Sequence, residues 1–154
     1  MSGLTICLWF DNHYVSIFRA CGRSASIDGA IRFKHGHGQN EDQPVVVNFT
    51  LDGQAISGLN GGPTFKFSPA VSLFVQCKDQ AELDMFWEKL MEGGAPMECG
   101  WLTDKYGFSW QVVPQMLLDV LQNGTAEQRQ RVADAVMKMV KLDVATLEAA
   151  RDAA

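Results

Sequence analysis

The sequence predicts an α+β fold made of two tandem β-α-β-β-β modules followed by C-terminal helices. Short apolar stretches rich in β-branched and aromatic residues alternate with Gly, Asn and Asp turns, a pattern typical of sheets of short strands. The order of elements before the linker Asn60-Gly-Gly-Pro63 returns after it, and superposing Gly53 on Gly107 brings Ser57 onto Gln111. We expect a single domain over residues 1–154, with module one over about 1–62, module two over about 63–114 and a helical tail over 115–154.

Module one begins with an apolar, β-prone stretch at residues 4–10 that Asp11-Asn12 ends. A short helix is expected at 13–19, a weaker strand at 24–33 and a polar, Gly-rich loop at 34–43. A strong strand is expected at 45–51, the turn signal Asp52-Gly53 follows it, and residues 54–59 return as the second arm of a hairpin.

Module two repeats this order with a strand at 69–77 and an amphipathic helix at 80–91, for which Asp79 is the expected N-cap. A second hairpin turns at Thr103–Gly107, and Pro114 ends its second arm. In that arm Phe108, Trp110 and Val112 alternate with Ser109, Gln111 and Val113, so one set faces a core and the other is left to form a site. Helices are expected at 114–121, 126–140 and 144–151.

The composition is that of a soluble globular protein, with 47% hydrophobic and 20% charged residues. A formal net charge of -5 disfavours nucleic acid and anionic membrane as partners, because both require a basic face. No apolar run approaches the roughly 20 residues that span a bilayer, and no signal peptide is visible, so the cytoplasm is the expected location. The four cysteines (Cys7, Cys21, Cys77 and Cys99) lack metal-ligand spacing and are expected to be buried or semi-buried free thiols.

A set of motifs in fixed order makes the chain similar to a known family. They are Leu8-Trp-Phe-Asp11, Tyr14-Val-Ser-Ile-Phe18, Phe49-Thr-Leu-Asp-Gly-Gln54, Leu59-Asn-Gly-Gly-Pro63, Phe65-Lys-Phe67, Trp87-Glu-Lys-Leu90, Gly93-Gly94, Cys99-Gly-Trp-Leu102, Asp104-Lys-Tyr-Gly-Phe-Ser-Trp-Gln-Val-Val-Pro114 and residues 137–147. Together they resemble the PhnB-like family of the vicinal oxygen chelate superfamily, the glyoxalase, bleomycin-resistance and extradiol-dioxygenase group. Members are often labelled 3-demethylubiquinone-9 3-methyltransferase, but no Gly-rich cofactor turn of the nucleotide-binding kind occurs in this chain.

The resemblance implies curled mixed sheets around a cup-shaped cavity, often completed by a dimer partner. In metal-dependent members four ligands come from the first and last strand of each module, and motif register carries those positions to Thr5, Ser57, Ala70 and Gln111. Of these four residues only Gln111 could ligate a divalent metal, and a lone amide oxygen is a poor site, so we expect neither a bound catalytic metal nor another cofactor. The family usually has a full helix between the equivalents of Asp11 and Tyr14. In this chain either that helix is shortened or the segment that would form it is absent from the sequence.

The same register predicts a ligand pocket with few charges, of the kind that suits a small neutral or aromatic molecule. Its expected residues are Thr5, Cys7, Trp9, Ser57, Ser72, Phe74 and Gln111. Trp9 has two open interpretations, ligand stacking or core packing. His35-Gly-His37 has ligand-like alternation in what reads as a loop tip, and His13 is expected to be a surface or packing residue.

Three functional hypotheses remain open from the sequence. The first is a metal-free, homodimeric, small-molecule-binding protein of the PhnB-like type, with polar contacts from Gln111, Ser57 and Thr5 and an apolar wall from Trp9 and Phe74. The second is an isomerase, lyase or dioxygenase that recruits a metal through Gln111. The third is a structural dimeric module whose cup is filled by its own side chains. No nucleophile and base stand at a spacing that identifies a reaction.

Overall fold

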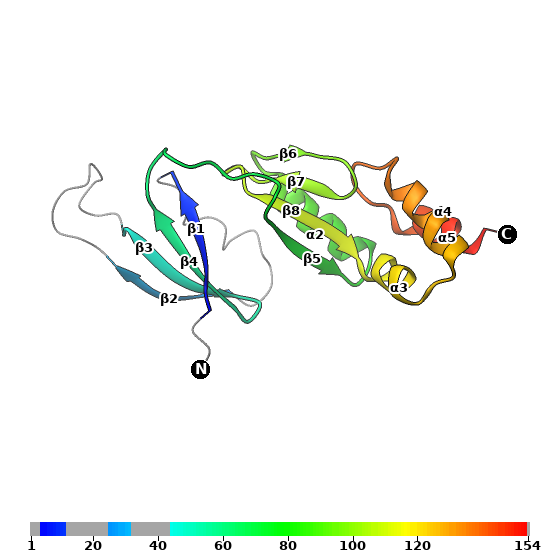
Figure 1. The fold of residues 1–154 in the computed structure, drawn as a ribbon, viewed down its shortest axis with the longest axis horizontal. Coiled ribbons are helices and arrows are strands. Elements are labelled where there is room, and N and C mark those ends of the chain that lie inside the picture. The colour runs from blue at the N-terminus through cyan, green and yellow to red at the C-terminus, as the bar shows by residue number, and fades with distance from the viewer. Residues whose placement is uncertain (1–3, 12–24, 32–43, 154) are drawn as a thin grey trace. The chain divides into compact units, whose positions relative to one another are not determined.

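The computed structural model describes residues 4–11, 25–31 and 44–153, and the chain forms two compact units, Met1–Phe67 and Ser68–Ala154 (Figure 1). Each unit is built on a mixed four-stranded sheet. The change from one unit to the next falls after Phe67, a few residues beyond the Gly-Gly-Pro linker.

Unit 1 contains β1 (Ile6–Phe10), β2 (Ala25–Ile31), β3 (Val46–Leu51) and β4 (Gln54–Asn60) in the order β1-β4-β3-β2. The predicted hairpin turn is confirmed, since Asp52 and Gly53 both have positive φ angles, +48° and +82°, as a two-residue hairpin loop requires. One face of the sheet is apolar and buried, and it carries Leu8, Phe10, Val47, Phe49 and Ile56. The alternation of buried and half-exposed residues follows from the two-residue period of a strand.

Unit 2 contains β5 (Ser72–Cys77), β6 (Ala95–Pro96), β7 (Trp101–Thr103) and β8 (Ser109–Pro114) in the order β5-β8-β7-β6. This order matches that of unit 1 strand for strand, and in both units the first strand lies parallel to the last. The predicted tandem repeat of sheets is therefore confirmed. The counterpart helix expected at 13–19 and the loop expected at 34–43 lie outside the described residues.

Helix α2 (Gln80–Met91) has the bounds that its apolar periodicity predicts. The Asp79 carboxylate accepts a hydrogen bond from the Glu82 amide at 2.8 Å, which satisfies one of the free N–H groups of the first turn. Leu83, Phe86, Trp87 and Leu90 form its buried face. In Figure 1 this helix lies behind the sheet of unit 2, where it contacts β8. Trp87 and Trp110 are both core residues, as predicted.

The hairpin between β7 and β8 is organised by the buried carboxylate of Asp104. Its Oδ1 accepts hydrogen bonds from the amides of Tyr106 and Phe108 at 2.9 and 3.0 Å, and its Oδ2 accepts one from Trp110 Nε1 at 2.9 Å. Gly107 closes the turn with a φ of +78° and donates its amide to the Asp104 carbonyl. One side chain thus fixes the register of β8.

Three helices follow: α3 (Gln115–Asn123), α4 (Ala126–Val136) and α5 (Val144–Asp152). The expected helix at 126–140 is wrong beyond Val136. The chain leaves the helix there because the carbonyls of Met139 and Val140 accept hydrogen bonds from the amides of Cys99 and Gly100, at 2.7 and 2.8 Å. Tertiary backbone pairing overrides the helical periodicity of this stretch.

Gln80 fastens α2 to the start of α5. Its Nε2 donates to Asp84 Oδ1 at 2.8 Å and to the Leu142 carbonyl at 3.3 Å, and its Oε1 accepts from the Val144 amide at 2.7 Å. Asp84 also pairs with Lys141 at 2.5 Å. Leu142 and Leu147 are buried, so the tail belongs to the core of unit 2. Among the helices that the structure describes, none combines the length and apolarity needed to cross a bilayer.

Candidate functional site

The open face of sheet A, the less buried face of the unit 1 sheet, carries the predicted site residues Cys7, Trp9 and Ser57, and Thr5 lies just before it. The parallel pairing of β1 with β4 puts Cys7 opposite Ser57, and the antiparallel pairing of β3 with β4 puts Asn48 on the other side of Ser57. Ser57 donates its hydroxyl to Asn48 Oδ1. Cys7 is exposed, whereas Ser57 and Asn48 are half-buried. Thr5 lies just before β1 and is exposed.

Trp9 is on the same face but is engaged by its own chain. Its Nε1 donates to the Gly62 carbonyl at 2.8 Å, and its ring meets Phe65 edge-on at a centroid distance of 4.9 Å. The backbone of Gly61 lies directly against the indole, since an added Cβ there would come within 2.2 Å of the ring. Trp9 therefore packs the segment that leaves β4.

A row of polar side chains on this face was missed by reasoning from the sequence. Thr50 donates its hydroxyl to Asp28 Oδ2 at 2.7 Å, and Ser26 donates to Asp28 Oδ1 at 2.9 Å. The signal was present in the alternation of β3, where Asn48 and Thr50 interrupt an apolar run at every second residue. The open face of sheet A is therefore hydroxyl- and amide-rich with one exposed carboxylate.

The open face of sheet B, the corresponding face in unit 2, brings the other predicted residues together. Gln111 lies opposite Phe74 on β5 and opposite Trp101 on β7. Its Nε2 donates to Ser72 Oγ at 2.8 Å, which fixes the amide and leaves its oxygen outside this bond. Phe74 is 44% exposed, an unusual state for an aromatic side chain at the middle of a strand.

Ser109 adds a further polar group to this face, because it pairs with Ser72 in the ladder. Its hydroxyl is fully buried and has no hydrogen-bond partner among the residues that the structure describes. A buried hydroxyl without a partner costs free energy, so such groups usually meet a water or a ligand atom. The open face of sheet B thus combines an oriented amide, two hydroxyls and an exposed aromatic ring.

The four positions that the resemblance assigns to metal ligands do not fit a divalent cation. Ala70 lies in a turn before β5, because this strand begins at Ser72 and not at 69 as expected. Thr5 and Ser57 offer only hydroxyls, and the amide oxygen of Gln111 by itself is a poor metal site. Over residues 4–11, 25–31 and 44–153, no group of three or more His, Cys, Asp or Glu side chains could hold a metal ion.

Cys7, Cys77 and Cys99 are free thiols, as expected, and Cys77 is buried and Cys99 half-buried. The expected burial is wrong for Cys7, which is exposed because it lies on the open face of sheet A. Cys21, His13, His35 and His37 lie outside the described residues, as does the segment between Asp11 and Tyr14.

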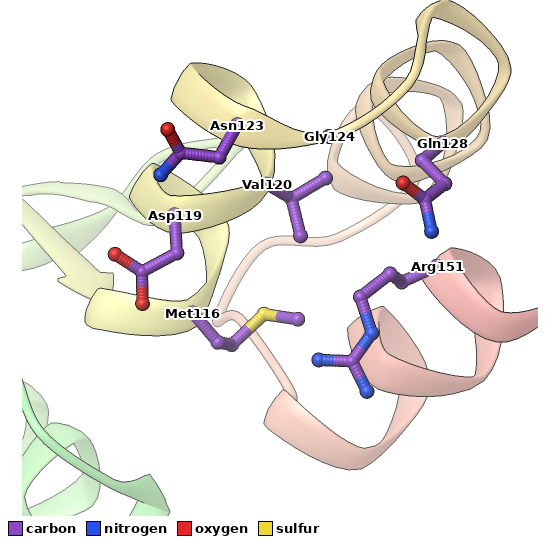
Figure 2. Close-up of a pocket in the computed structure, with 7 residues that line it drawn as sticks. All are labelled: Met116, Asp119, Val120, Asn123, Gly124, Gln128 and Arg151. Atoms are coloured by element: carbon purple, nitrogen blue, oxygen red, sulfur yellow. The ribbon is translucent and has the colours of Figure 1, made fainter.

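A pocket lies among the C-terminal helices, apart from the residues of the predicted site. It has a volume of about 250 Å³ and is lined by Met116, Asp119, Val120, Asn123, Gly124, Gln128 and Arg151 (Figure 2). These side chains come from α3, α5 and the start of α4. Sequence reasoning gave no sign of it, because its residues meet only when the three helices pack.

Comparison with known proteins places these features in context. A family model described as 3-demethylubiquinone-9 3-methyltransferase matches residues 2–113. The PhnB protein from Bacillus cereus is similar in structure, with a TM-score of 0.64 and 26% identity over 73% of this chain and 99% of that one. Protein PA1353 from Pseudomonas aeruginosa has a TM-score of 0.55 and 16% identity, over 72% of this chain and 98% of that one.

A third solved structure is a glyoxylase/bleomycin resistance protein/dioxygenase domain from Frankia sp. EAN1pec, with a TM-score of 0.44 and 15% identity over 73% of this chain and 92% of that one. The search of curated proteins found no match. The matched region of the family model ends within β8, so α3, α4 and α5 lie beyond it.

Proposed function

The chain belongs to the 3-demethylubiquinone-9 3-methyltransferase family, and from that membership we propose that it is a PhnB-like small-molecule-binding protein whose ligand contacts the open face of sheet B. The observation that carries the proposal is the oriented amide of Gln111. Its bond to Ser72 holds the side chain in place beside Phe74, which is 44% exposed. An oriented polar group next to an exposed aromatic ring is the usual make-up of a site for a small organic molecule.

The ligand suited to this face is small, and neutral or aromatic. No charged side chain of the described strands pairs with Gln111, so ionic recognition is absent from its immediate neighbours. The amide oxygen of Gln111 accepts a hydrogen bond, and the ring of Phe74 offers a flat apolar contact. The open face of sheet A, with the Ser57–Asn48 pair, is the equivalent surface in unit 1.

Methyl transfer is not part of the proposal. The description of the family names a methyltransferase, but a nucleotide-like methyl donor is commonly bound by a Gly-rich turn between a strand and a helix of a parallel sheet. Both sheets that the structure describes are mixed and follow the order first, last, third, second. The proposal rests on the fold and on the residues of the open face.

A homodimer and a cytoplasmic location complete the proposal. The open face of sheet B has no covering helix among the described elements, and Phe74 on this face is an exposed apolar residue. A second copy would cover such surface. The free thiols of Cys7 and Cys77 suit a reducing compartment. Sedimentation equilibrium gives the oligomeric state, and a monomer at all concentrations would contradict the dimer.

The test is a fragment screen by ligand-observed NMR, followed by titration of the best aromatic fragment into wild type, Gln111→Ala and Gln115→Ala. Loss of the Gln111 amide is expected to weaken binding at least about tenfold, because one oriented hydrogen bond in a half-buried site is lost. Gln115 begins α3 and is exposed, so its variant serves as the matched control. Equal affinity for all three proteins, with intact circular dichroism spectra, would refute this placement of the site.

A further inference from the structure

The pocket among α3, α4 and α5 carries opposite charges on opposite sides. In Figure 2 the Arg151 guanidinium and the Asp119 carboxylate lie on either side of the Met116 side chain. Val120 is buried and closes the apolar part of the lining. Such a pocket offers one cationic group, one anionic group and an apolar floor between them.

The cationic side is held in a fixed orientation. Arg151 donates from Nε and one terminal nitrogen to the two carboxylate oxygens of Asp152, both at 2.7 Å. The backbone beneath it is fixed as well, because the Arg131 side chain donates to the Arg151 carbonyl at 2.9 Å. A bidentate pair leaves the other terminal nitrogen of the guanidinium free to turn to a third partner.

The Asp119 carboxylate on the anionic side is also oriented, because one of its oxygens accepts a hydrogen bond. Asp119 Oδ1 accepts a hydrogen bond from Gln115 Nε2 at 2.9 Å, and among the described residues no other side chain donates to this carboxylate. The wall between the two charges is fixed by the capping box of α4, in which Thr125 and Gln128 bond each other's backbone amides. Gly124 fits there because an added Cβ would come within 2.6 Å of the Val120 carbonyl.

From this arrangement we infer that the pocket binds a small zwitterion of the amino-acid type. Its carboxylate pairs with Arg151, its ammonium group with Asp119, and a short apolar side chain contacts Met116 and Val120. A volume of about 250 Å³ is ample for a molecule the size of valine. The site is separate from the open faces of the sheets and lies outside the region that the family model matches.

The test compares three probes that differ by one charged group: L-valine, isovalerate and isobutylamine. Each is titrated into the ¹⁵N-labelled full chain, and the amide shifts of Val120 and Gly124 report occupancy of the pocket. Valine is expected to bind saturably and at least about tenfold more tightly than either singly charged probe, because each of those lacks one charge-assisted hydrogen bond.

Substitutions test whether Asp119 and Arg151 bind the two charged groups of valine. Asp119→Asn and Arg151→Gln are each expected to weaken valine binding at least about tenfold. Asp134→Asn is the matched control, because Asp134 is another helical carboxylate that accepts a hydrogen bond at 2.9 Å from a glutamine four residues earlier. Its affinity for valine is expected to stay as in the wild type.

Two results would overturn the inference. The absence of saturable shifts with valine up to about 100 mM, well above the Kd of a weak ligand, would mean that the pocket does not bind zwitterions. Equal affinity for valine and isovalerate, unchanged in Asp119→Asn, would mean that it is an anion site served by Arg151 alone. Neither outcome affects the site proposed at Gln111, which different variants and fragments probe.

Discussion

Replacing Asp104 with alanine is expected to destabilise the protein more than the loss of any exposed carboxylate. Asp104 is only 8% exposed, and three N–H donors point at its two oxygens. Two of these donors, the Phe108 amide and Trp110 Nε1, are themselves buried. In the alanine variant neither has a replacement partner, and water reaches a fully packed hairpin only by disturbing it.

The magnitude follows from those two donors. A buried donor left without an acceptor costs about 1–3 kcal/mol, so two cost about 2–6 kcal/mol. That is a large part of the roughly 5–15 kcal/mol by which a domain of ordinary stability is folded. The variant Asp104→Asn keeps one carbonyl oxygen for the two backbone amides and sets an NH₂ group against the indole, so it is expected to lose about 1–3 kcal/mol.

Urea unfolding at pH 7, followed by tryptophan fluorescence and circular dichroism, measures these losses. A double-mutant cycle with Trp110→Phe separates the indole bond from the rest, because the Asp104→Ala loss should be smaller in the phenylalanine background. A loss below about 1 kcal/mol in Asp104→Ala, or no coupling in the cycle, would refute the view that this carboxylate organises the hairpin.

Burial also raises the pKa of Asp104 above its ordinary value of 3.8, against the opposing effect of the three donors. The folded protein then takes up a proton at higher pH than the unfolded chain. The part of the stability that is linked to this proton is complete below pH 3.8 and is lost as the pH rises through the folded pKa, whereas the hydrogen bonds to the carboxylate contribute separately at pH 7. A carboxyl titration by NMR should give a midpoint above 3.8, and a lower midpoint would contradict the direction of the shift.

Three further predictions concern packing, accessibility and pH. Gly61→Ala should lower the urea midpoint by the equivalent of about 1–3 kcal/mol because its Cβ meets an indole ring, whereas Gly29→Ala, with nothing within 4 Å, should change it little. Peptide mapping after brief thiol alkylation should find Cys7 labelled and Cys77 protected, since the first is exposed and the second buried; equal labelling would mean that β5 opens readily. Hydrogen bonds from Lys141 and Gln80 lower the pKa of Asp84, so its contribution is present above pH 3.8 and is lost as the pH falls through the folded pKa. The free energies of unfolding of wild type and Asp84→Asn should therefore differ only slightly at pH 7, as is usual for exposed ion pairs. The difference should vanish in acid.

Much of the fold could be predicted because local chemistry and tertiary structure agree. The two-residue turn at Asp52-Gly53, the N-cap at Asp79 and the apolar face of α2 are each determined within a few residues of sequence. The family resemblance, confirmed by the match over residues 2–113, gave two mixed sheets in tandem but not the order of their strands. The end of α4 could not be predicted, because the groups that stop it at Val136 are the amides of Cys99 and Gly100.

The candidate site was predictable only in part. Register alone placed Ser72 beside Gln111 and Cys7 beside Ser57, because paired strands hold such residues at fixed positions. The state of Trp9 was not predictable, since it depends on Gly61 and Gly62 approaching the indole. The helical pocket gave no sequence signal, because Asp119 and Arg151 are thirty-two residues apart and belong to helices with no shared motif.

The anchoring of α2 by the end of the chain has a consequence for biosynthesis. Gln80 bonds to Leu142 and Val144, and Leu147 fills part of the same core, so unit 2 lacks essential contacts until its last helix has left the ribosome. Unit 1 ends at Phe67, so all of its residues are made before those that complete unit 2. In a nascent chain the apolar face of α2 therefore lacks part of its packing until residues 142–147 have emerged.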